Sequence, residues 1–163
     1  MARRAFFSFH YSRDIWRANV VRNSWMTHAD RTAAGFWDAS LWEEAKRKGR
    51  AAIERMIDTG LRNTSVTEVL IGAETAYRDY VRYEIAESHG LGKGLLGIYI
   101  NNIANHKGIE DDEGENPFNH LYFDENGRRT FLSEIYPTYD WFGDDGYLNI
   151  GSWIETAALA AGR

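Results

Sequence analysis

One glutamate of this sequence, Glu84, occupies a position that asks for a chemical explanation. It lies in residues 77–88, whose spacing predicts a helix. At about 100° per residue, one side of that helix carries Glu84 together with five less polar neighbours, Tyr77, Tyr80, Val81, Ile85 and Ser88. A carboxylate in an apolar stripe loses hydration and needs a partner, a pocket or a raised pKa, which makes Glu84 a candidate site residue. In the alternative interpretation, which the stretch alone slightly favours, Tyr77 and Tyr80 lie at a partly hydrated edge of the helix and the Glu84 side chain points to water.

The histidines are a second group of residues that could do chemistry. None of the five has the helical spacing of metal ligands, so we expect no structural or catalytic metal. His10 differs because it ends a predicted strand, where it could be a hydrogen-bonded structural residue or a ligand contact. No Walker loop and no G-x-G-x-x-G motif follows a predicted strand, so the familiar phosphate-binding devices are absent.

Composition limits the class of protein. The chain has 163 residues, 44% hydrophobic and 26% charged, which predicts one globular domain over residues 1–163. No apolar run approaches the roughly 20 residues of a membrane helix, so we expect a cytoplasmic protein with no membrane partner. No cysteine is present to form a disulfide, and a net charge of −5 argues against a nucleic-acid partner. The aromatic fraction, 14%, suits either a core or a pocket for flat ligands.

Apolar strands and amphipathic helices alternate along the chain. The predicted strands are residues 5–10, 35–38, 65–71 and 95–100. The predicted helices are residues 12–25, 41–61, 77–88 and 150–161, the last starting at Asn149. This alternation indicates an α/β fold with a mainly parallel central sheet covered on both faces. We therefore expect a flavodoxin-like, three-layer αβα sandwich.

The segment after the fourth predicted strand is less regular. Residues 101–119 are rich in Asn, Asp, Glu and Gly without periodicity, and such a long stretch is usually functional or mobile. Residues 121–123 and 131–136, with a tight turn at 124–127 between them, predict a short hairpin. Residues 139–141 are a candidate for the last strand of the sheet.

The expected fold predicts where a ligand would bind. In open α/β sheets, ligands lie beyond the carboxyl ends of the strands at the switch point beside the first strand. That rule brings residues 8–12, 38–42, 72–77 and 99–102 around one crevice. Four aromatic residues are candidate walls for flat bases, or could equally pack around a strand end: Phe9, Tyr11, Trp37 and Trp42.

Several segments, taken in order, resemble a known family. They are Phe-Phe-Ser-Phe-His-Tyr at 6–11, Asp-Ala-Ser-Leu-Trp-Glu at 38–43, residues 64–72, Val-Arg-Tyr-Glu-Ile at 81–85, and Gly-Glu-Asn-Pro-Phe at 114–118. Together with residues 144–147 and 153–155, they resemble the prokaryotic TIR-like family that supplies the ThsB subunit of Thoeris anti-phage defence. The resemblance covers nearly the whole chain.

The resemblance implies a TIR-like fold and an activity. Defence members convert NAD⁺ into a cyclic ADP-ribose-type signal that activates a separate effector, so NAD⁺ would be a substrate with no further cofactor, and a phage-derived trigger is expected. The catalytic glutamate of the family maps onto Glu84. Expected substrate contacts are Ser8, Phe9, His10, Tyr11, Asp38, Trp42 and Tyr77. The chain departs from TIR sequences at Tyr77, where they commonly have a small hydroxyl residue, and at Tyr80, where they have tryptophan.

The implied chemistry is consistent with one carboxylate. Cleavage of the nicotinamide–ribose bond passes through an oxocarbenium-like state, and glycosidases use two carboxylates because their leaving oxygen must be protonated. Nicotinamide already leaves as a neutral base, so Glu84 alone would suffice to bind ribose hydroxyls or stabilise positive charge. Cyclisation further requires an internal group, rather than water, to reach the anomeric carbon.

Two hypotheses of other classes stay open. Many TIR domains are scaffolds, so the chain could be a non-catalytic interaction module that assembles with itself or with a partner. It could also be a nucleotide-binding sensor that holds its ligand without cleaving it. A homo-oligomer is compatible with each hypothesis.

Overall fold

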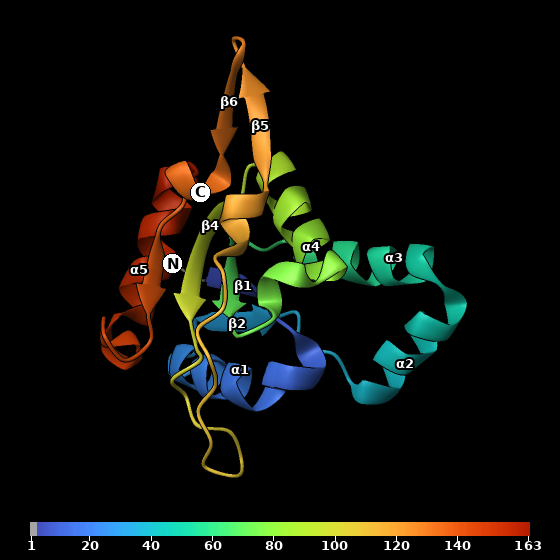
Figure 1. Cartoon of the computed structure of the whole chain (residues 1–163), viewed down its shortest axis with the longest axis vertical. Helices are drawn as coiled ribbons and strands as arrows, with labels where there is room; N and C mark the ends of the chain where they lie inside the picture. The colour runs from blue at the N-terminus through green and yellow to red at the C-terminus, as the bar shows by residue number, and fades with distance from the viewer. Residues whose placement is uncertain (1–2) are drawn as a thin grey trace.

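A five-stranded parallel sheet forms the centre of the computed structural model, which describes residues 3–163. Its spatial order is β2-β1-β3-β4-β7, the 2-1-3-4-5 order of flavodoxin-like folds (Figure 1). The strands are β1 (Arg3–Ser8), β2 (Arg31–Ala34), β3 (Val66–Ile71), β4 (Gly94–Tyr99) and β7 (Thr138–Asp140). The predicted α/β fold class and the predicted last strand are confirmed.

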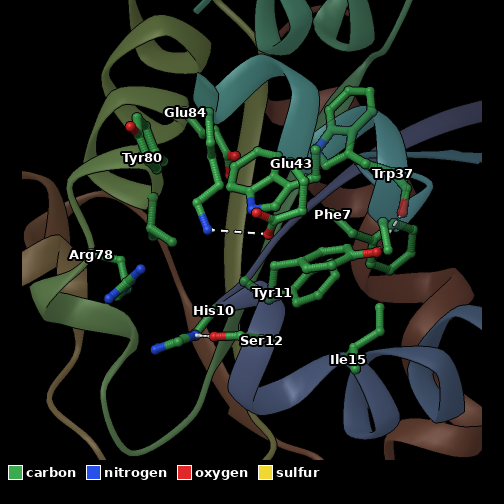
Figure 2. Close-up of a pocket in the computed structure, with 16 residues that line it drawn as sticks. Phe7, His10, Tyr11, Ser12, Ile15, Trp37, Glu43, Arg78, Tyr80 and Glu84 are labelled. Carbon is green, nitrogen blue, oxygen red and sulfur yellow. Dashed lines mark hydrogen bonds and ion pairs between the residues drawn. The ribbon is translucent and has the colours of Figure 1, made fainter. Parts of the chain in front are cut away.

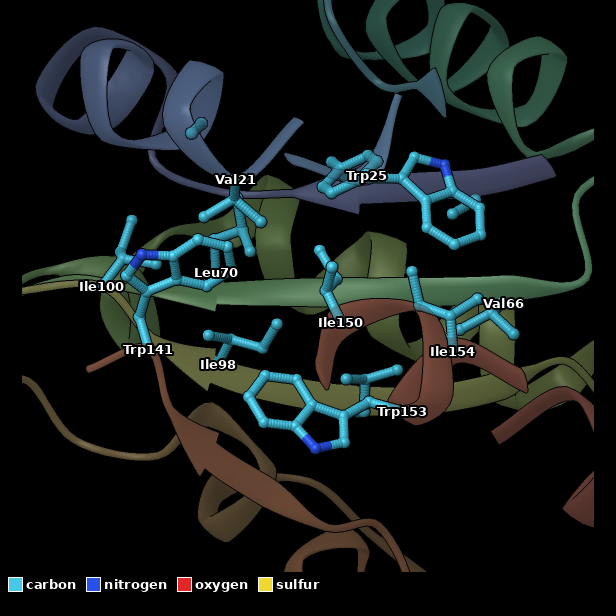
Figure 3. Packing of buried hydrophobic residues seen from close by; sticks show 14 of the residues in the cluster. Val21, Trp25, Val66, Leu70, Ile98, Ile100, Trp141, Ile150, Trp153 and Ile154 are labelled. Carbon is cyan, nitrogen blue, oxygen red and sulfur yellow. The ribbon is translucent and has the colours of Figure 1, made fainter. Parts of the chain in front are cut away.

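Helices cover both faces of the sheet. The helices α1 (Tyr11–Trp25) and α5 (Gly146–Ala160) cover one face, and α3 (Arg50–Leu61) and α4 (Asp79–Gly90) cover the other. On the first face, Val66 and Leu70 of β3 pack with residues of α1 and α5 (Figure 3). On the second face, Val69 and Ile71 pack against α4. Each such buried side chain contributes about 1.5–3 kcal/mol, so the two apolar interfaces fix the three layers.

All residues of β3 are buried because it is a central strand with helices on both sides. Side chains alternate across a strand, so Glu68 faces the α1 and α5 side with Val66 and Leu70. Thr67 on the opposite side hydrogen-bonds to Ser88 of α4, with 2.6 Å between the two hydroxyl oxygens. The middle of the sheet therefore contains a carboxyl group, Glu68, that the apolar pattern does not single out.

The second strand is Arg31–Ala34, and the prediction of residues 35–38 was wrong. Gly35 ends the strand with a φ of 90°, and a Cβ at this position would lie 2.3 Å from the Phe7 carbonyl oxygen. Only glycine tolerates both the positive φ and this close approach. Phe36 and Trp37 therefore leave the sheet and lead toward the next helix.

The predicted helix 41–61 is two helices, α2 (Ala39–Lys48) and α3, and the prediction of a single helix was wrong. The break is at Gly49, whose φ of 103° lies outside the helical region. Asp38 caps the start of α2, because its carboxylate accepts a hydrogen bond from the Ser40 amide at 2.8 Å. In Figure 1, α2 runs at an angle to α3 and stands away from the sheet, and Ala45 is its one buried residue.

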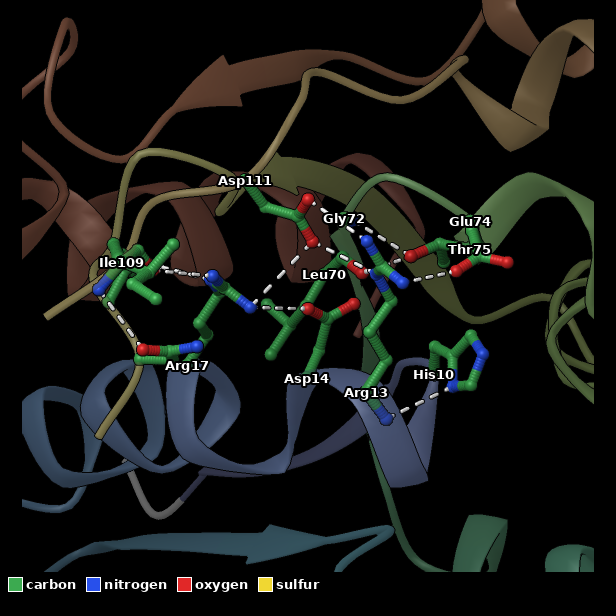
Figure 4. A network of polar contacts seen from close by, with 12 residues as sticks. His10, Arg13, Asp14, Arg17, Leu70, Gly72, Glu74, Thr75, Ile109 and Asp111 are labelled. Carbon is green, nitrogen blue, oxygen red and sulfur yellow. Dashed lines mark hydrogen bonds and ion pairs between the residues drawn. The ribbon is translucent and has the colours of Figure 1, made fainter. Parts of the chain in front are cut away.

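The long segment after β4 is held to the body by two arginines of α1 (Figure 4). The Arg17 guanidinium donates to the carbonyls of Ile103 and Ile109, at 2.7 and 2.9 Å. Arg13 binds both carboxylate oxygens of Asp111, at 2.9 and 3.0 Å. Residues 101–116 contain no helix or strand, yet these contacts fix the course of the segment.

A hairpin is present as predicted, formed by β5 (Tyr122–Glu125) and β6 (Arg128–Phe131), an antiparallel pair that projects from the body in Figure 1. Its second strand precedes the predicted residues 131–136, so that part of the prediction was wrong. Short 3₁₀ turns flank the hairpin, η2 (Pro117–His120) before and η3 (Leu132–Glu134) after. Two other helix starts differ from prediction. Residue 77 belongs to a separate turn, η1 (Thr75–Tyr77), and α5 begins at Gly146 rather than near residue 150.

Within residues 3–163, no helix combines the length and the apolar character that crossing a membrane requires.

Candidate active site

A cavity of about 420 Å³ opens at the carboxyl end of β1, between the start of α1, the helix α2 and the first half of α4 (Figure 2). Its volume lies within the range of about 300–1,000 Å³ that small-molecule sites occupy. The position beside the first strand is where the fold predicts a ligand. Residues of four connected segments meet here, so the break at Gly49 and the turn at Gly35 both shape the site.

Glu84 reaches this cavity from the second turn of α4. It is 6% exposed, and its Oε2 has no hydrogen-bond partner among residues 3–163. Burial raises the pKa of Glu84 to about 8, and the nearby Ser8 hydroxyl lowers that pKa only in part. Ser8 Oγ is itself fully buried and forms no hydrogen bond of normal geometry within the described chain. Glu84 therefore holds its proton at neutral pH, and its Oε2 is a buried polar atom without a partner in the described chain.

Four aromatic residues form one side of the cavity, and we call them the aromatic wall: Phe9, Tyr11, Trp42 and Tyr80. Phe9 and Tyr11 stack with ring centroids 5.9 Å apart, and Tyr11 stacks on Trp42 at 5.8 Å. Trp42 then meets Tyr80 edge-on, at 86° and 5.8 Å. The Tyr11 hydroxyl donates to the Trp37 carbonyl, which fixes the orientation of its ring. Such pairs contribute about 0.5–1.5 kcal/mol each beyond burial, so the wall is a preformed surface for a flat ring.

His10 lies at the junction of β1 and α1 and caps that helix. Its Nδ1 accepts a hydrogen bond from the Arg13 amide at 3.3 Å, which assigns the proton of the neutral ring to Nε2. Burial, with the nearby Arg78 guanidinium as a second cause, lowers the pKa of His10. His10 is therefore a neutral imidazole at neutral pH, with an Nε2–H donor at the cavity.

Three charged side chains lie at the rim of the cavity. Glu43 and Lys46 come from α2 and form an ion pair at 3.3 Å, and Arg78 precedes the first turn of α4. Figure 2 shows Arg78 on the same side as His10, with Glu43 across the cavity. The site thus combines a buried carboxyl, an aromatic surface and a charged rim.

The structure brings most of the predicted site residues together. Phe9, His10, Tyr11, Trp42 and Glu84 line the cavity, and Ser8 lies behind Glu84.

Two predicted residues lie elsewhere. Asp38 is exposed and caps α2, and Tyr77 is exposed with its ring 6.3 Å from that of His120. The predicted crevice segments 72–77 and 99–102 do not line the cavity, and Gly114 of the long segment packs directly on the backbone of Gly72 and Ala73.

Among the lining residues that sequence reasoning missed are the polar or charged Tyr80, Glu43, Lys46 and Arg78. Tyr80 carried a usable signal, because it lies four residues before Glu84 and so on the same helix face. Glu43 and Lys46 carried no such signal. In the predicted single helix 41–61, the Glu43 side chain points to solvent and pairs with Arg47. The break at Gly49 changes both the direction of α2 and the partner of Glu43.

No three histidine, aspartate or glutamate side chains in the described part of the chain are grouped as metal ligands would be. The groups that a ligand would meet in the cavity are organic ones: the Glu84 carboxyl, the His10 imidazole, the aromatic wall and the charged rim.

A family model for the Thoeris protein ThsB, TIR-like domain, matches residues 6–105. This chain belongs to the ThsB TIR-like family. The matched range contains all sixteen residues that line the cavity, from Phe7 to Glu84. A Bacillus cereus protein named "Putative cyclic ADP-D-ribose synthase ThsB1" is 39% identical over an alignment of 192 positions, which covers 95% of this chain and 100% of that protein. The family resemblance found in the sequence is confirmed.

Proposed function

We propose that this protein cleaves NAD⁺ at the nicotinamide–ribose bond and forms a cyclic ADP-ribose-type product. The observation that carries the proposal is Glu84, a buried carboxyl with an unpartnered oxygen at the inner end of an aromatic cavity. The name of the Bacillus cereus relative, a cyclic ADP-ribose synthase, supports the same reaction class.

In the proposed reaction, the bond between the ribose C1′ and the nicotinamide nitrogen breaks, and its electron pair passes to the ring nitrogen. The positively charged ring thereby leaves as neutral nicotinamide and needs no proton. Positive charge develops on the ribose, and the ionised Glu84 carboxylate stabilises it in a site that excludes water. Because the nicotinamide ring of NAD⁺ is positive, its arrival next to Glu84 lowers the pKa of that carboxyl and favours the ionised form.

Cyclisation requires a nucleophilic atom in the adenosine part of the same molecule to form the new bond to C1′. The dinucleotide must then fold back on itself, and the aromatic wall supports this because a stacked adenine is held within reach of the ribose. Its four rings also occupy the space that a competing water would need. His10 contributes a neutral Nε2–H donor to the same cavity, suited to an oxygen of the ligand.

The signalling context follows from the family. We propose that the product activates a separate effector protein and that a phage-derived trigger switches the enzyme on. The ThsB TIR-like family assignment supports this defence context.

The test is to incubate the purified full-length protein with NAD⁺, with and without extract from phage-infected cells, and to follow nicotinamide by chromatography and the product by mass spectrometry. Wild type is expected to release nicotinamide and to yield a product with the mass of ADP-ribose less one water. Glu84→Gln preserves size and is expected to stop both. Glu87→Gln, three residues along the same helix and outside the cavity, is the matched control.

Equal turnover by wild type and Glu84→Gln under every triggering condition would overturn the proposal. Tight NAD⁺ binding with intact ligand recovered afterwards would instead identify a nucleotide-binding sensor. Loss of cellular defence through surface changes but not through Glu84→Gln would identify an interaction module.

A further inference from the structure

Arg78 differs from the other arginines near the cavity because it has no partner. Arg13 and Arg17 each bind carboxylates or carbonyl oxygens. The Arg78 guanidinium, by contrast, forms no hydrogen bond and no ion pair with residues 3–163, although it lines the cavity. An arginine presents five donors in a rigid fork that fits the oxygens of a phosphate. The cavity therefore has an unused anion-binding group at its rim.

Lys46 of α2 adds a second cation to the lining. Its partner is Glu43 at 3.3 Å, and the two side chains are 49% and 65% exposed. Exposed ion pairs of this kind are worth about 0–1 kcal/mol, so a ligand anion can replace Glu43 at little cost. Lys46 is thus available to a ligand that reaches the rim.

The fixed charges of the lining favour an anion. At neutral pH, Glu84 and His10 are both uncharged, because burial raises the pKa of the first and lowers that of the second. The charges that remain are positive at Lys46 and Arg78 and negative at Glu43. On a chain with a net charge of −5, this rim is locally positive. A bound anion would meet two cations and one displaceable carboxylate.

The spacing along α4 fits a nucleoside diphosphate. Arg78 precedes Glu84 by six residues, which corresponds to about 9 Å along a helix at 1.5 Å per residue. A ligand whose ribose meets Glu84 at the inner end would carry its 5′ phosphates outward toward the rim, within reach of an extended arginine side chain. When the base of that ligand stacks on the aromatic wall, its 5′ phosphates again lie at the rim of the cavity.

We propose that Arg78, together with Lys46, binds the diphosphate of the dinucleotide and makes the site select diphosphate-linked ligands over nucleosides. This inference rests on the proposed function for the identity of the ligand. It assigns Arg78 to substrate binding and selection, while Glu84 acts on the ribose.

The test uses ADP-ribose, which contains the diphosphate and lacks nicotinamide, so that binding is measured without turnover. Calorimetry on the full-length protein is expected to give an affinity that falls about tenfold to a hundredfold in Arg78→Gln, the effect of losing charged hydrogen bonds. Arg78→Lys keeps the charge and is expected to retain part of the affinity. Arg55→Gln, an exposed arginine outside the cavity, is the matched control and should bind as wild type.

Two further measurements separate diphosphate binding from a general disturbance of the fold. Glu43→Gln removes the competing carboxylate and frees Lys46, so it should tighten ADP-ribose binding several-fold, opposite in sign to Arg78→Gln. Nicotinamide riboside, which has no phosphate, should bind weakly to wild type and lose less than about twofold in Arg78→Gln. Thermal unfolding of each variant checks that it is folded.

The outcomes distinguish this inference from the proposed function. Equal weakening of both ligands, no weakening of ADP-ribose, or no ADP-ribose binding by wild type would each overturn the role of Arg78. Arg78-dependent binding of ADP-ribose without any NAD⁺ cleavage would retain the binding role and reject the proposed reaction.

Discussion

Two carboxyl groups, Glu84 and Glu68, are buried on opposite faces of the same sheet, and they differ in what surrounds them. Glu84 lies on α4 at the inner end of the cavity, 6% exposed and with one unpartnered oxygen. Glu68 lies on β3 in the apolar layer beneath α1 and α5, 0% exposed, and neither of its oxygens has a partner in the described chain. Burial raises the pKa of both groups.

The comparison teaches that a raised pKa and a missing partner do not identify an active site by themselves. Both carboxyl oxygens of Glu68 lack partners, against one of Glu84, yet Glu68 does not line the cavity that Glu84 reaches. Glu84 combines the same electrostatic perturbation with an aromatic wall, a neutral imidazole and access to solvent. Access is the property that separates a group able to act on a substrate from one that only destabilises the fold.

The most direct test of this comparison is to replace the carboxyl groups of Glu84 and Glu68 by amides, one at a time. Glu84→Gln should lower kcat/KM for NAD⁺ by about a hundredfold to a thousandfold, the typical loss when one group that stabilises transition-state charge is removed. Glu68→Gln should leave kcat/KM within about twofold, because the Glu68 side chain does not line the cavity and its carboxyl has no hydrogen bond to a residue that does. Nicotinamide release measures both. A comparable loss in Glu68→Gln would show that burial, rather than access, marks the functional group.

The pH dependence of activity should follow Glu84. The reaction needs the ionised carboxylate, and the folded protein holds the proton up to a pKa of about 8. We therefore expect kcat/KM to rise about tenfold per pH unit below that pKa and to level off above it. The profile of kcat should be displaced to lower pH, because the bound nicotinamide ring is positive. A profile of kcat/KM that is flat between pH 6 and 9 would contradict the role of an ionised Glu84.

The stability prediction concerns Glu68. Replacing a buried, unpartnered carboxyl by the apolar Glu68→Met should raise the free energy of unfolding by about 1–4 kcal/mol. Its folded pKa is raised above the unfolded value, so the native state binds the extra proton and stability is lost as pH rises. The gain from Glu68→Met should therefore be larger at pH 7 than at pH 5. Urea unfolding at the two pH values measures it, and a loss of stability at both would contradict this interpretation of Glu68.

The sequence predicted the parallel sheet, its strand order and the identity of Glu84 as a site candidate, because these depend on periodicity and on family segments. It could not predict where the aromatic residues before α2 leave the sheet, since Phe36 and Trp37 have the composition of a strand. The deciding feature is the contact of Gly35 with the Phe7 backbone, which joins two strands and is not a local property.

The rim of the cavity could not be predicted for a similar reason. One residue in a positive-φ conformation, Gly49, redirects α2 and turns Glu43 and Lys46 toward the site. Asp38 and Tyr77 were expected near the substrate from the family pattern, but capping of α2 and packing near His120 determine their positions. Glu68 is hidden within an apolar strand, and only the three-dimensional packing shows that both of its oxygens lack partners.

The smallest expected effect tests what sets the pKa of Glu84 within its own surroundings. The buried Ser8 hydroxyl lowers that pKa against the larger effect of burial, so Ser8→Ala should raise it. The midpoint of the kcat/KM profile should then move to higher pH by less than about one unit, the scale of a single neutral hydrogen-bonding group. Ser88→Ala is the control, because the Ser88 hydroxyl donates to the Glu84 backbone carbonyl and not to its carboxyl. A midpoint that moves equally in both variants would mean that packing on α4, and not the Ser8 hydroxyl, tunes the group that distinguishes this site from Glu68.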